Sequence, residues 1–216
     1  QNPEYRLTIP LKGYLPSTAV DYHLGLGMAT PPMPPILDIK RAWKGGTNNN
    51  MWDTTADNWS TNDSTSKYIS GDSVIFDIRG SSNTTVQLSG SLTPGYVVVN
   101  SPNDYTITGT GSIDGTTSLL KSGKSTLTLS AKCSYTGATK VDDGTLYVNA
   151  KLSGSPVTVN FNAYLGGTDT IVQPVTLLSG AKLAPGTTTT AGSLTLGSNL
   201  TLSGNIFYFD LTDDST

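Results

Sequence analysis

Aspartates are the side chains in this sequence whose type and spacing come nearest to those of catalytic groups. Glycoside hydrolysis needs two carboxylates placed across a sugar, and Asp142 and Asp143 form an adjacent pair within the repetitive part of the chain. They precede Gly144, however, and an Asp-Asp-Gly sequence is typical of a turn. Three further aspartates also stand beside turn residues, namely Asp104, Asp114 and Asp169. These carboxylates therefore predict turns better than they predict a catalytic pair.

Histidine and cysteine each occur once, as His23 and Cys133. His23 falls in the N-terminal region, so the repetitive part of the chain supports neither a Ser-His-Asp triad nor a histidine-based metal site. The sequence also lacks lyase-like groupings of acidic and basic residues and the calcium-binding Gly-Gly-x-Gly-x-Asp nonapeptide. Cys133 cannot form an internal disulfide and is interpreted as a small, partly buried residue. We therefore predict no catalytic residue, no metal site and no cofactor, and we expect that the protein is not an enzyme.

Three tryptophans lie close together in the sequence, at Trp43, Trp52 and Trp59. Flat indole faces suit pyranose rings, so one hypothesis is that these residues bind glycans. The other is that they cover apolar surface at the end of a repetitive fold, where a terminal cap is needed. Because large aromatic side chains most often serve to bury area, we favour the cap.

The strands expected to carry these residues are short and repeat with a period of about 18 to 19 residues, as in the spacing of Leu146, Leu165 and Leu183. One phrase recurs as residues 144–148, 163–167, 181–186 and 200–204, and a second as residues 155–159, 173–177 and 192–196. Within each phrase apolar residues alternate with polar ones, which is typical of a strand with one buried face. Gly, Pro, Ser and Asn separate the phrases and predict turns.

This pattern predicts an all-β protein, a right-handed parallel β-helix in which equivalent strands of successive coils stack. We expect the β-helix to occupy residues 72–216, preceded by a Trp-rich cap at residues 41–71 and an N-terminal extension at residues 1–40. No stretch shows a helical period of apolar residues over three turns. Leu146, Leu165 and Leu183 are expected to point inward in one column.

Composition limits the partners. The net charge of −3 and the lack of basic clusters argue against nucleic-acid binding. The longest apolar runs, such as residues 96–99, are too short to span a bilayer, so no transmembrane segment is predicted. The chain begins at Gln1, as would a secreted protein after removal of its signal peptide or a recombinantly expressed chain. We expect an extracellular or cell-surface location.

The N-terminal extension contains a strand of its own, in which Tyr5, Leu7, Ile9 and Leu11 would share one face. Pro10 places this strand on a sheet edge. Residues 30–35, Thr-Pro-Pro-Met-Pro-Pro, predict a stiff polyproline linker. A strand on such a tether can fold back onto its own solenoid or add to the sheet of a neighbouring subunit.

Residues 122–146 resemble the autotransporter-associated β-strand repeat, also called the passenger-associated transport repeat. In that family a Gly-Thr-Leu-x-Leu phrase leads into Tyr-Thr-Gly-x-Thr-x-Val and then Gly-Thr-Leu. This chain has Ser125-Thr126-Leu127-Thr128-Leu129, in which Ser125 departs from the pattern, then residues 135–141, Tyr-Thr-Gly-Ala-Thr-Lys-Val, and then Gly144-Thr145-Leu146. Residues 165–171 and 183–186 are similar to the coils that follow. The resemblance implies a right-handed β-helix exported to the cell exterior, and it implies no catalytic residues.

The open strands at the two ends of the chain suggest assembly. Residues 205–211 form a strongly β-prone run with Ile206, Phe207 and Phe209, and an unpaired strand at a solenoid end invites another chain. We predict a homo-oligomer that assembles head to tail into an extracellular filament or surface layer by donation of the N-terminal strand. The alternative is a passenger fragment of a surface adhesin that binds cell-surface glycans. A polysaccharide-degrading β-helix enzyme is the less favoured hypothesis, because fold alone does not decide function.

Overall fold

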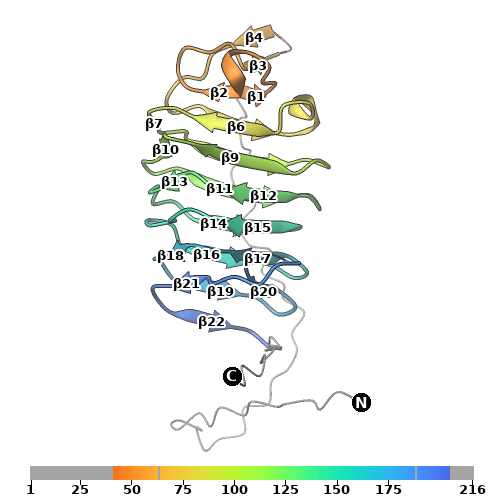
Figure 1. Cartoon of the computed structure of the whole chain (residues 1–216), viewed down its shortest axis with the longest axis vertical. Coiled ribbons are helices and arrows are strands. Elements are labelled where there is room, and N and C mark those ends of the chain that lie inside the picture. The colour runs from red at the N-terminus through yellow and green to blue at the C-terminus, as the bar shows by residue number, and fades with distance from the viewer. Residues whose placement is uncertain (1–40, 63, 188, 205–216) are drawn as a thin grey trace, which may run out of the picture. The chain divides into compact units, whose positions relative to one another are not determined.

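The computed structural model describes residues 41–62, 64–187 and 189–204, and it shows stacked coils of short strands (Figure 1). These residues contain no α-helix, only two single-turn 3-10 segments, η1 (Asn48–Asn50) and η2 (Ile78–Gly80). Nearly all strand pairing is parallel and joins one coil to the next. The predicted all-β, parallel β-helix fold is confirmed for this part of the chain.

The strands fall into three ladders that run along the solenoid. Sheet A contains, in spatial order, β22 (Leu200–Leu202), β19 (Val175–Leu177), β16 (Val157–Val159), β14 (Thr139–Val141), β11 (Ser118–Ser122), β8 (Tyr96–Asn100), β5 (Ser73–Phe76), β1 (Arg41–Trp43), β3 (Trp59–Thr61) and β4 (Ser64–Ser66). Sheet B contains β2 (Met51–Trp52), β6 (Thr85–Leu88), β9 (Tyr105–Gly109), β12 (Thr126–Leu129), β15 (Thr145–Val148), β17 (Tyr164–Gly167) and β20 (Lys182–Pro185). Sheet C contains β7 (Ser91–Leu92), β10 (Ser112–Ile113) and β13 (Lys132–Cys133), and further along β18 (Thr170–Ile171) and β21 (Thr195–Leu196).

The inward column predicted from the sequence period is present in sheet B. Leu146 pairs with Leu165, and Leu165 pairs with Leu183 in the next coil. Leu165 is fully buried between its two neighbours. Because the side chains of a strand alternate, the residues between these leucines face outward, and most of them are polar. The core is therefore a continuous rod of Leu, Val and Ile inside the three sheets.

The turns follow the residue types expected from the sequence. Gly144, which ends the Asp-Asp-Gly turn, has a φ of +69°, a value that L side chains rarely adopt. A Cβ atom at this position would also lie 2.4 Å from the carbonyl oxygen of Ser125 in the coil before. Only glycine therefore permits both the turn and the close approach of the two coils at this corner.

One part of the predicted register is wrong, near the C-terminal end of the described chain. Residues 192–196 were expected to continue the line of β16 and β19, and residues 200–204 the leucine column of sheet B. Instead β21 pairs with β18 in sheet C, and β22 pairs with β19 in sheet A. The coil between β19 and β22 is thus longer than the coil between β16 and β19. The added residues lie around 186–194, where Gly186 pairs with Gly167 and Ala191 in antiparallel bridges.

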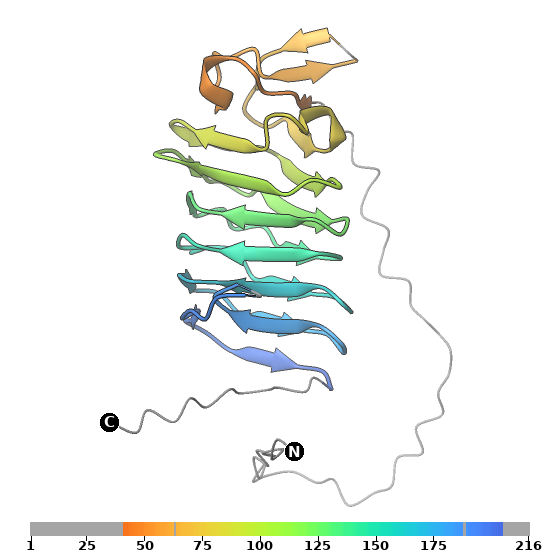
Figure 2. The ribbon, with the colours of Figure 1, turned by 45° about the vertical axis from the view of Figure 1, so that its right-hand side comes forward.

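The coil stacking also begins earlier than the predicted start near Asp72. β1 pairs in parallel with β5, and β2 pairs in parallel with β6, so residues from Arg41 onward already form a coil. The antiparallel hairpin of β3 and β4 then adds to the outer side of β1. The Trp-rich segment is thus a first coil together with a hairpin placed over its end (Figure 2).

Candidate assembly site at the ends of the solenoid

An aromatic plug fills the first coils, formed by Trp43, Trp52, Trp59, Tyr68, Phe76 and Tyr105. The ring centroids of Trp43 and Trp59 lie 5.0 Å apart, and those of Trp52 and Trp59 lie 5.1 Å apart, both in edge-to-face arrangements. The three indoles are fully buried. A buried ring has no free face for a pyranose, so the structure gives no support to glycan binding by these tryptophans.

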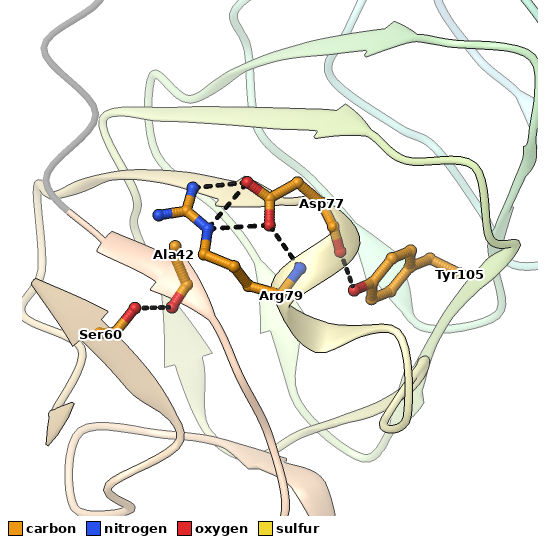
Figure 3. A network of polar contacts seen from close by, with 5 residues as sticks. All are labelled: Ala42, Ser60, Asp77, Arg79 and Tyr105. Carbon is orange, nitrogen blue, oxygen red and sulfur yellow. Dashed lines mark hydrogen bonds and ion pairs between the residues drawn. The ribbon is translucent and has the colours of Figure 1, made fainter. Parts of the chain in front are cut away.

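Polar groups close the first coils around the plug (Figure 3). Tyr105 donates its phenolic hydrogen to the backbone oxygen of Asp77 at 2.7 Å, and burial raises the pKa of this phenol. The Asp77 carboxylate accepts hydrogen bonds from the Arg79 backbone nitrogen at 2.9 Å and from its guanidinium group. Arg41 donates from Nε to the Asp72 carboxylate at 2.5 Å and thereby ties β1 to the following coil.

Asn58 takes over backbone bonds that a preceding coil would otherwise make. Its buried side chain accepts from the Thr47 nitrogen at 2.8 Å and donates to the backbone oxygens of Thr47 and Met51, each at 2.8 Å. Met51 lies on β2, whose described ladder partner is on one side only. Asn58 and the β3–β4 hairpin thus cover the N-terminal end of the first coil, and β4 becomes the edge strand of sheet A.

The other end of the described solenoid is built differently. Within residues 41–62, 64–187 and 189–204, the last strands β20, β21 and β22 each pair with the preceding coil alone. Leu202 continues the inward column of Leu177, which is fully buried, yet 44% of Leu202 is exposed. Four further leucines pack partly exposed against the core here, namely Leu183, Leu194, Leu196 and Leu200. This end of the described chain presents apolar core and one-sided strands.

The residues predicted to carry assembly lie outside the described residues. This applies to the candidate donor strand, Tyr5, Leu7, Ile9 and Leu11, and to the candidate C-terminal edge, Ile206, Phe207 and Phe209. The structure brings the three tryptophans together in the plug, and it places the strand before residue 205 in sheet A, where the candidate edge would follow. Pairing between the two segments stays a prediction.

A buried lysine is the residue that the sequence reasoning missed. Lys121 points inward on β11, in register with Val99 and Val141, and its side chain is fully buried. Its ammonium donates to the backbone oxygens of Ser122 at 3.0 Å, Gly123 at 2.6 Å and Asp143 at 3.2 Å. Desolvation lowers the pKa of Lys121 to about 8. Lys121 lies two residues after Leu119, so the two side chains share one face of the strand. This spacing is the sequence signal that indicates an inward position for Lys121.

Lys121 acts as a clamp between coils. It joins the turn at residues 122–123 to Asp143 in the next coil, and no carboxylate in the described chain forms a salt bridge with it. Gly144 leaves the space, because a Cβ there would lie 2.7 Å from the lysine Nζ. The Lys121 ammonium thus donates hydrogen bonds to carbonyl groups of two turns, which is a structural role.

The Tyr-Thr-Gly-Ala-Thr sequence that carries the family resemblance forms a buried chain of hydroxyl groups. Tyr135 shares a hydrogen bond of 2.7 Å with Thr139, which shares one of 2.8 Å with Ser155 in the next coil. All three side chains are fully buried. Cys133 lies buried beside them, and burial raises the pKa of its thiol to about 12, so the thiol is not activated. The residues that carry the resemblance thus have a packing role here.

The aspartates considered as catalytic groups are engaged in local contacts. Asp142 accepts from the Asn160 amide at 2.6 Å and pairs with the Lys140 ammonium at 3.0 Å. Asp143 accepts from the Gly144 nitrogen at 2.8 Å, as expected for a turn.

Asp114 accepts from three serines on successive coils, Ser91 and Ser112 at 2.5 Å each and Ser134. Burial alone would raise the pKa of Asp114, but these hydroxyl groups lower it below its ordinary value. Asp114 therefore links three coils of sheet C. Among the described residues no group of three or more His, Cys, Asp or Glu is placed to hold a metal ion.

Comparisons of the chain with protein-family models, with curated proteins and with solved structures found no match. Within the described residues there is no helix of the length and apolarity needed to cross a membrane. The β-solenoid architecture agrees with a repeat β-helix protein.

Proposed function

We propose that this protein is an extracellular structural β-solenoid whose subunits join head to tail, the strand Tyr5–Leu11 of one subunit being added at the C-terminal end of the next. The observation that carries the proposal is the difference between the two ends. One end has a plug, a hairpin and the Asn58 bonds, while the other exposes Leu202, which belongs to the inward column, in the described chain.

This difference favours donation of a strand over simple stacking of whole solenoids. The β3–β4 hairpin occupies the outer side of β1, so a neighbour's last coil cannot pair with β1 and would meet only the edge of β4, a short polar strand of three residues. A strand that is added at the open end has to come from outside the coils. The alternating segment Tyr5–Leu11 would provide apolar side chains on one face and backbone groups on its edges. A head-to-tail contact that does not close on itself produces a fibre.

The family resemblance supports an extracellular location for such an assembly. The coil that contains Tyr135 and Thr139 is the segment that resembles the autotransporter-associated β-strand repeat. Proteins of that family are exported β-helices in which the repeat is structural. A scaffold role also suits the fold, because stacked coils gain stability from neighbour contacts without a catalytic cleft.

Electron microscopy and analytical ultracentrifugation of the full-length protein test the proposal. We expect filaments or layers from the full chain and monomers from a chain lacking residues 1–16. A matched pair of variants separates strand docking from a change of charge. Leu7→Asp with Ile9→Asp places charge on the apolar face and should abolish assembly, whereas Arg6→Asp with Thr8→Asp changes the other face and should retain it.

Two results would overturn strand donation. The first is a full-length protein that stays monomeric at high concentration, in which case the fragment of a surface adhesin takes its place. The second is equal assembly by the shortened chain. A glycan array on the same monomer then tests the adhesin hypothesis, and binding that survives replacement of the three tryptophans would place the glycan site elsewhere on the solenoid.

A further inference from the structure

Two Asp-Gly dipeptides occur in the sequence, Asp114-Gly115 and Asp143-Gly144. In such a dipeptide the glycine nitrogen can attack the side-chain carbon Cγ of the aspartate and close a succinimide ring. Glycine favours this attack, because it has no side chain that would shield its nitrogen. The two dipeptides follow different strands, β10 and β14, and they differ in the groups that hold the aspartate carboxylate.

The carboxylate of Asp143 is held against the nitrogen that would attack it. Its Oδ1 atom accepts a hydrogen bond from the Gly144 nitrogen at 2.8 Å, and within the described residues the carboxylate has no other hydrogen bond. Because Oδ1 is bonded to Cγ, this contact also brings Cγ close to the glycine nitrogen. Reacting atoms that are already held together react faster than atoms that must first meet. Asp143 and Gly144 are both half-buried, so water reaches this corner.

Lys121 places a positive charge on the peptide group that would react. Its ammonium donates to the backbone oxygen of Asp143 at 3.2 Å, and this oxygen belongs to the peptide bond between Asp143 and Gly144. When the Gly144 nitrogen gives up its proton, negative charge spreads onto this oxygen. A donor that already points at a developing negative charge lowers the barrier, most strongly where water is excluded. Lys121 is fully buried, so the fold supplies such a donor.

The fold also requires the glycine that makes this dipeptide reactive. A Cβ atom at position 144 would lie 2.4 Å from the backbone oxygen of Ser125 and 2.7 Å from Nζ of Lys121. A larger residue would therefore have to displace the preceding coil or the buried ammonium. The reactive Asp-Gly pair is thus a consequence of close packing between coils at this corner.

Asp114 has the same neighbour, but its carboxylate is engaged elsewhere. It accepts hydrogen bonds from Ser91 and Ser112, each at 2.5 Å, and from Ser134. The ring closes through the protonated carboxyl group, because one carboxyl oxygen has to leave as water. Burial raises the pKa of Asp114, but the serine hydroxyl groups outweigh it and lower the pKa, so the protonated form is scarce. Asp114-Gly115 is therefore a matched control within the same chain.

We infer that Asp143 is a site of spontaneous covalent modification, at which the Asp143-Gly144 dipeptide converts through a succinimide to isoaspartate. In the first step the Gly144 nitrogen forms a bond to Cγ of Asp143. The nitrogen loses its proton, and the carboxyl group loses one oxygen as water. In the second step water adds to the ring. Cleavage between the nitrogen and Cγ restores aspartate, whereas cleavage between the nitrogen and the backbone carbonyl carbon gives isoaspartate.

Isoaspartate changes the connection between β14 and β15. The main chain then runs through the side chain of residue 143 and is longer by one carbon atom. The Asp143 backbone carbonyl, which Lys121 contacts, becomes a free carboxylate. The hydrogen bond from the Tyr164 nitrogen to the Gly144 oxygen, 2.8 Å long, has to adjust in the next coil. This inference does not depend on head-to-tail assembly, because all the reacting groups belong to one chain.

Ageing of the full-length protein in water enriched in heavy oxygen tests the site. Each succinimide that hydrolyses takes up one oxygen atom from the solvent, so peptide mass spectrometry counts the events at each Asp-Gly pair. An isoaspartate-specific methyltransferase then identifies the product. In the folded protein we expect Asp143 to take up label about tenfold faster than Asp114, whereas in urea the two should react at similar rates. Equal rates in the folded protein, or a faster rate at Asp114, would overturn the inference.

The Lys121→Met variant separates the effect of the ammonium from loosening of the corner. Loss of the ammonium should slow labelling at Asp143 several-fold and leave Asp114 unchanged. A corner that is only loosened would react faster, so faster labelling at Asp143 would contradict the role of Lys121.

Replacement of two serines gives the opposite test at the control site. Ser112→Ala with Ser134→Ala releases the carboxylate of Asp114 and should speed labelling there, while Asp143 keeps its rate. Circular dichroism checks that each variant retains the β fold. Unchanged labelling at Asp114 in this variant would show that the serines are not what distinguishes the two dipeptides.

Discussion

Lys121 shows how a single buried charge is used inside a solenoid. Its ammonium has three backbone oxygens as partners and, among the described residues, no carboxylate in a salt bridge, so turn carbonyls are the groups that stabilise its charge directly. Removing a charged group from water costs free energy unless hydrogen bonds replace the hydration. The corner of the coil supplies those bonds, and Gly144 supplies the room.

This environment predicts a particular pH dependence of stability. The pKa of Lys121 is about 8 in the folded protein and near 10.5 when exposed, so between these values the unfolded chain binds more protons. The free energy of unfolding should therefore rise with pH across this window. We expect the wild type to gain stability relative to Lys121→Met between pH 8 and pH 10.5, measured by urea unfolding at fixed ionic strength.

Subtracting the free energy of unfolding of Lys121→Met from that of the wild type cancels the contribution of the other titrating groups to the pH dependence. Burial raises the pKa of Cys133 and Tyr68 to about 12 each, so those groups lower stability as the pH rises above their unfolded values. Both proteins contain them, and their effect cancels in the difference. A difference that is flat, or that falls with pH, would show that the ammonium is not desolvated in solution.

At the scale of elements, the plug and the hairpin of the first coil act together. Trp59 lies on β3 and packs against Trp43, Trp52 and Phe76, and its own strand pairs with β1. The hairpin thus owes its position to the indole side chain as much as to backbone bonds. Truncation of a buried aromatic residue typically costs about 3–5 kcal/mol.

We expect Trp59→Ala to lower the stability of the first coil by about 3–5 kcal/mol. Ile69→Ala is the matched control, because 57% of Ile69 is exposed, and it should change stability by about 0.5 kcal/mol or less. In the wild type the tryptophan emission should be blue-shifted, resistant to acrylamide and unchanged by added oligosaccharides. Red-shifted emission in the wild type, or a sugar-dependent shift, would contradict burial of the plug.

The sheet to which each strand belongs could be predicted from the sequence only where the repeat of 18 to 19 residues stayed constant. Leu146, Leu165 and Leu183 were placed correctly because their coils have nearly the same length and keep the alternation intact. Residues 192–196 and 200–204 resemble the earlier phrases, but the extra residues near Gly186 shift both by one sheet. Short Leu-Thr-Leu strands fit either sheet, so local pattern could not distinguish the two.

The first coil and the ends were harder to predict for a different reason. Two strands of the first coil, Arg41–Trp43 and Met51–Trp52, are too short to show alternation. Long-range tertiary contacts decide their pairing with β5 and β6. The burial of all three indoles depends on side chains from several strands meeting in one place, which a sequence period does not encode. The inward position of Lys121 was readable from alternation, but its carbonyl partners come from two coils.

At the scale of the whole molecule, the solenoid should behave as a row of coils that each contact their neighbours. Stability is then close to a sum of coil and interface terms, and no interior coil is indispensable. The coils around residue 157 offer a direct test, because Val157 and Val175 occupy the same ladder position and each follows a proline.

Deletion of residues 157–174 removes one whole coil and joins Pro156 to Val175. Thr139 then meets Val175 in place of Val157, and Leu146 meets Leu183 in place of Leu165, so the residue types on both ladders are kept. At roughly 0.05–0.15 kcal/mol per residue, the loss should be about 1–3 kcal/mol. We expect a cooperative thermal transition, an unchanged β circular dichroism spectrum and a solenoid that is shorter by about 4.8 Å in small-angle scattering.

The matched control is deletion of residues 157–165, which removes only half of that coil. Every later strand then arrives half a coil too early, so strands no longer meet their partners in the coil before and the C-terminal coils should fail to form. If both deletions were tolerated equally, register between coils would not determine stability. If both unfolded the chain, the solenoid would be a single cooperative core, and coils could not serve as independent building units of a filament.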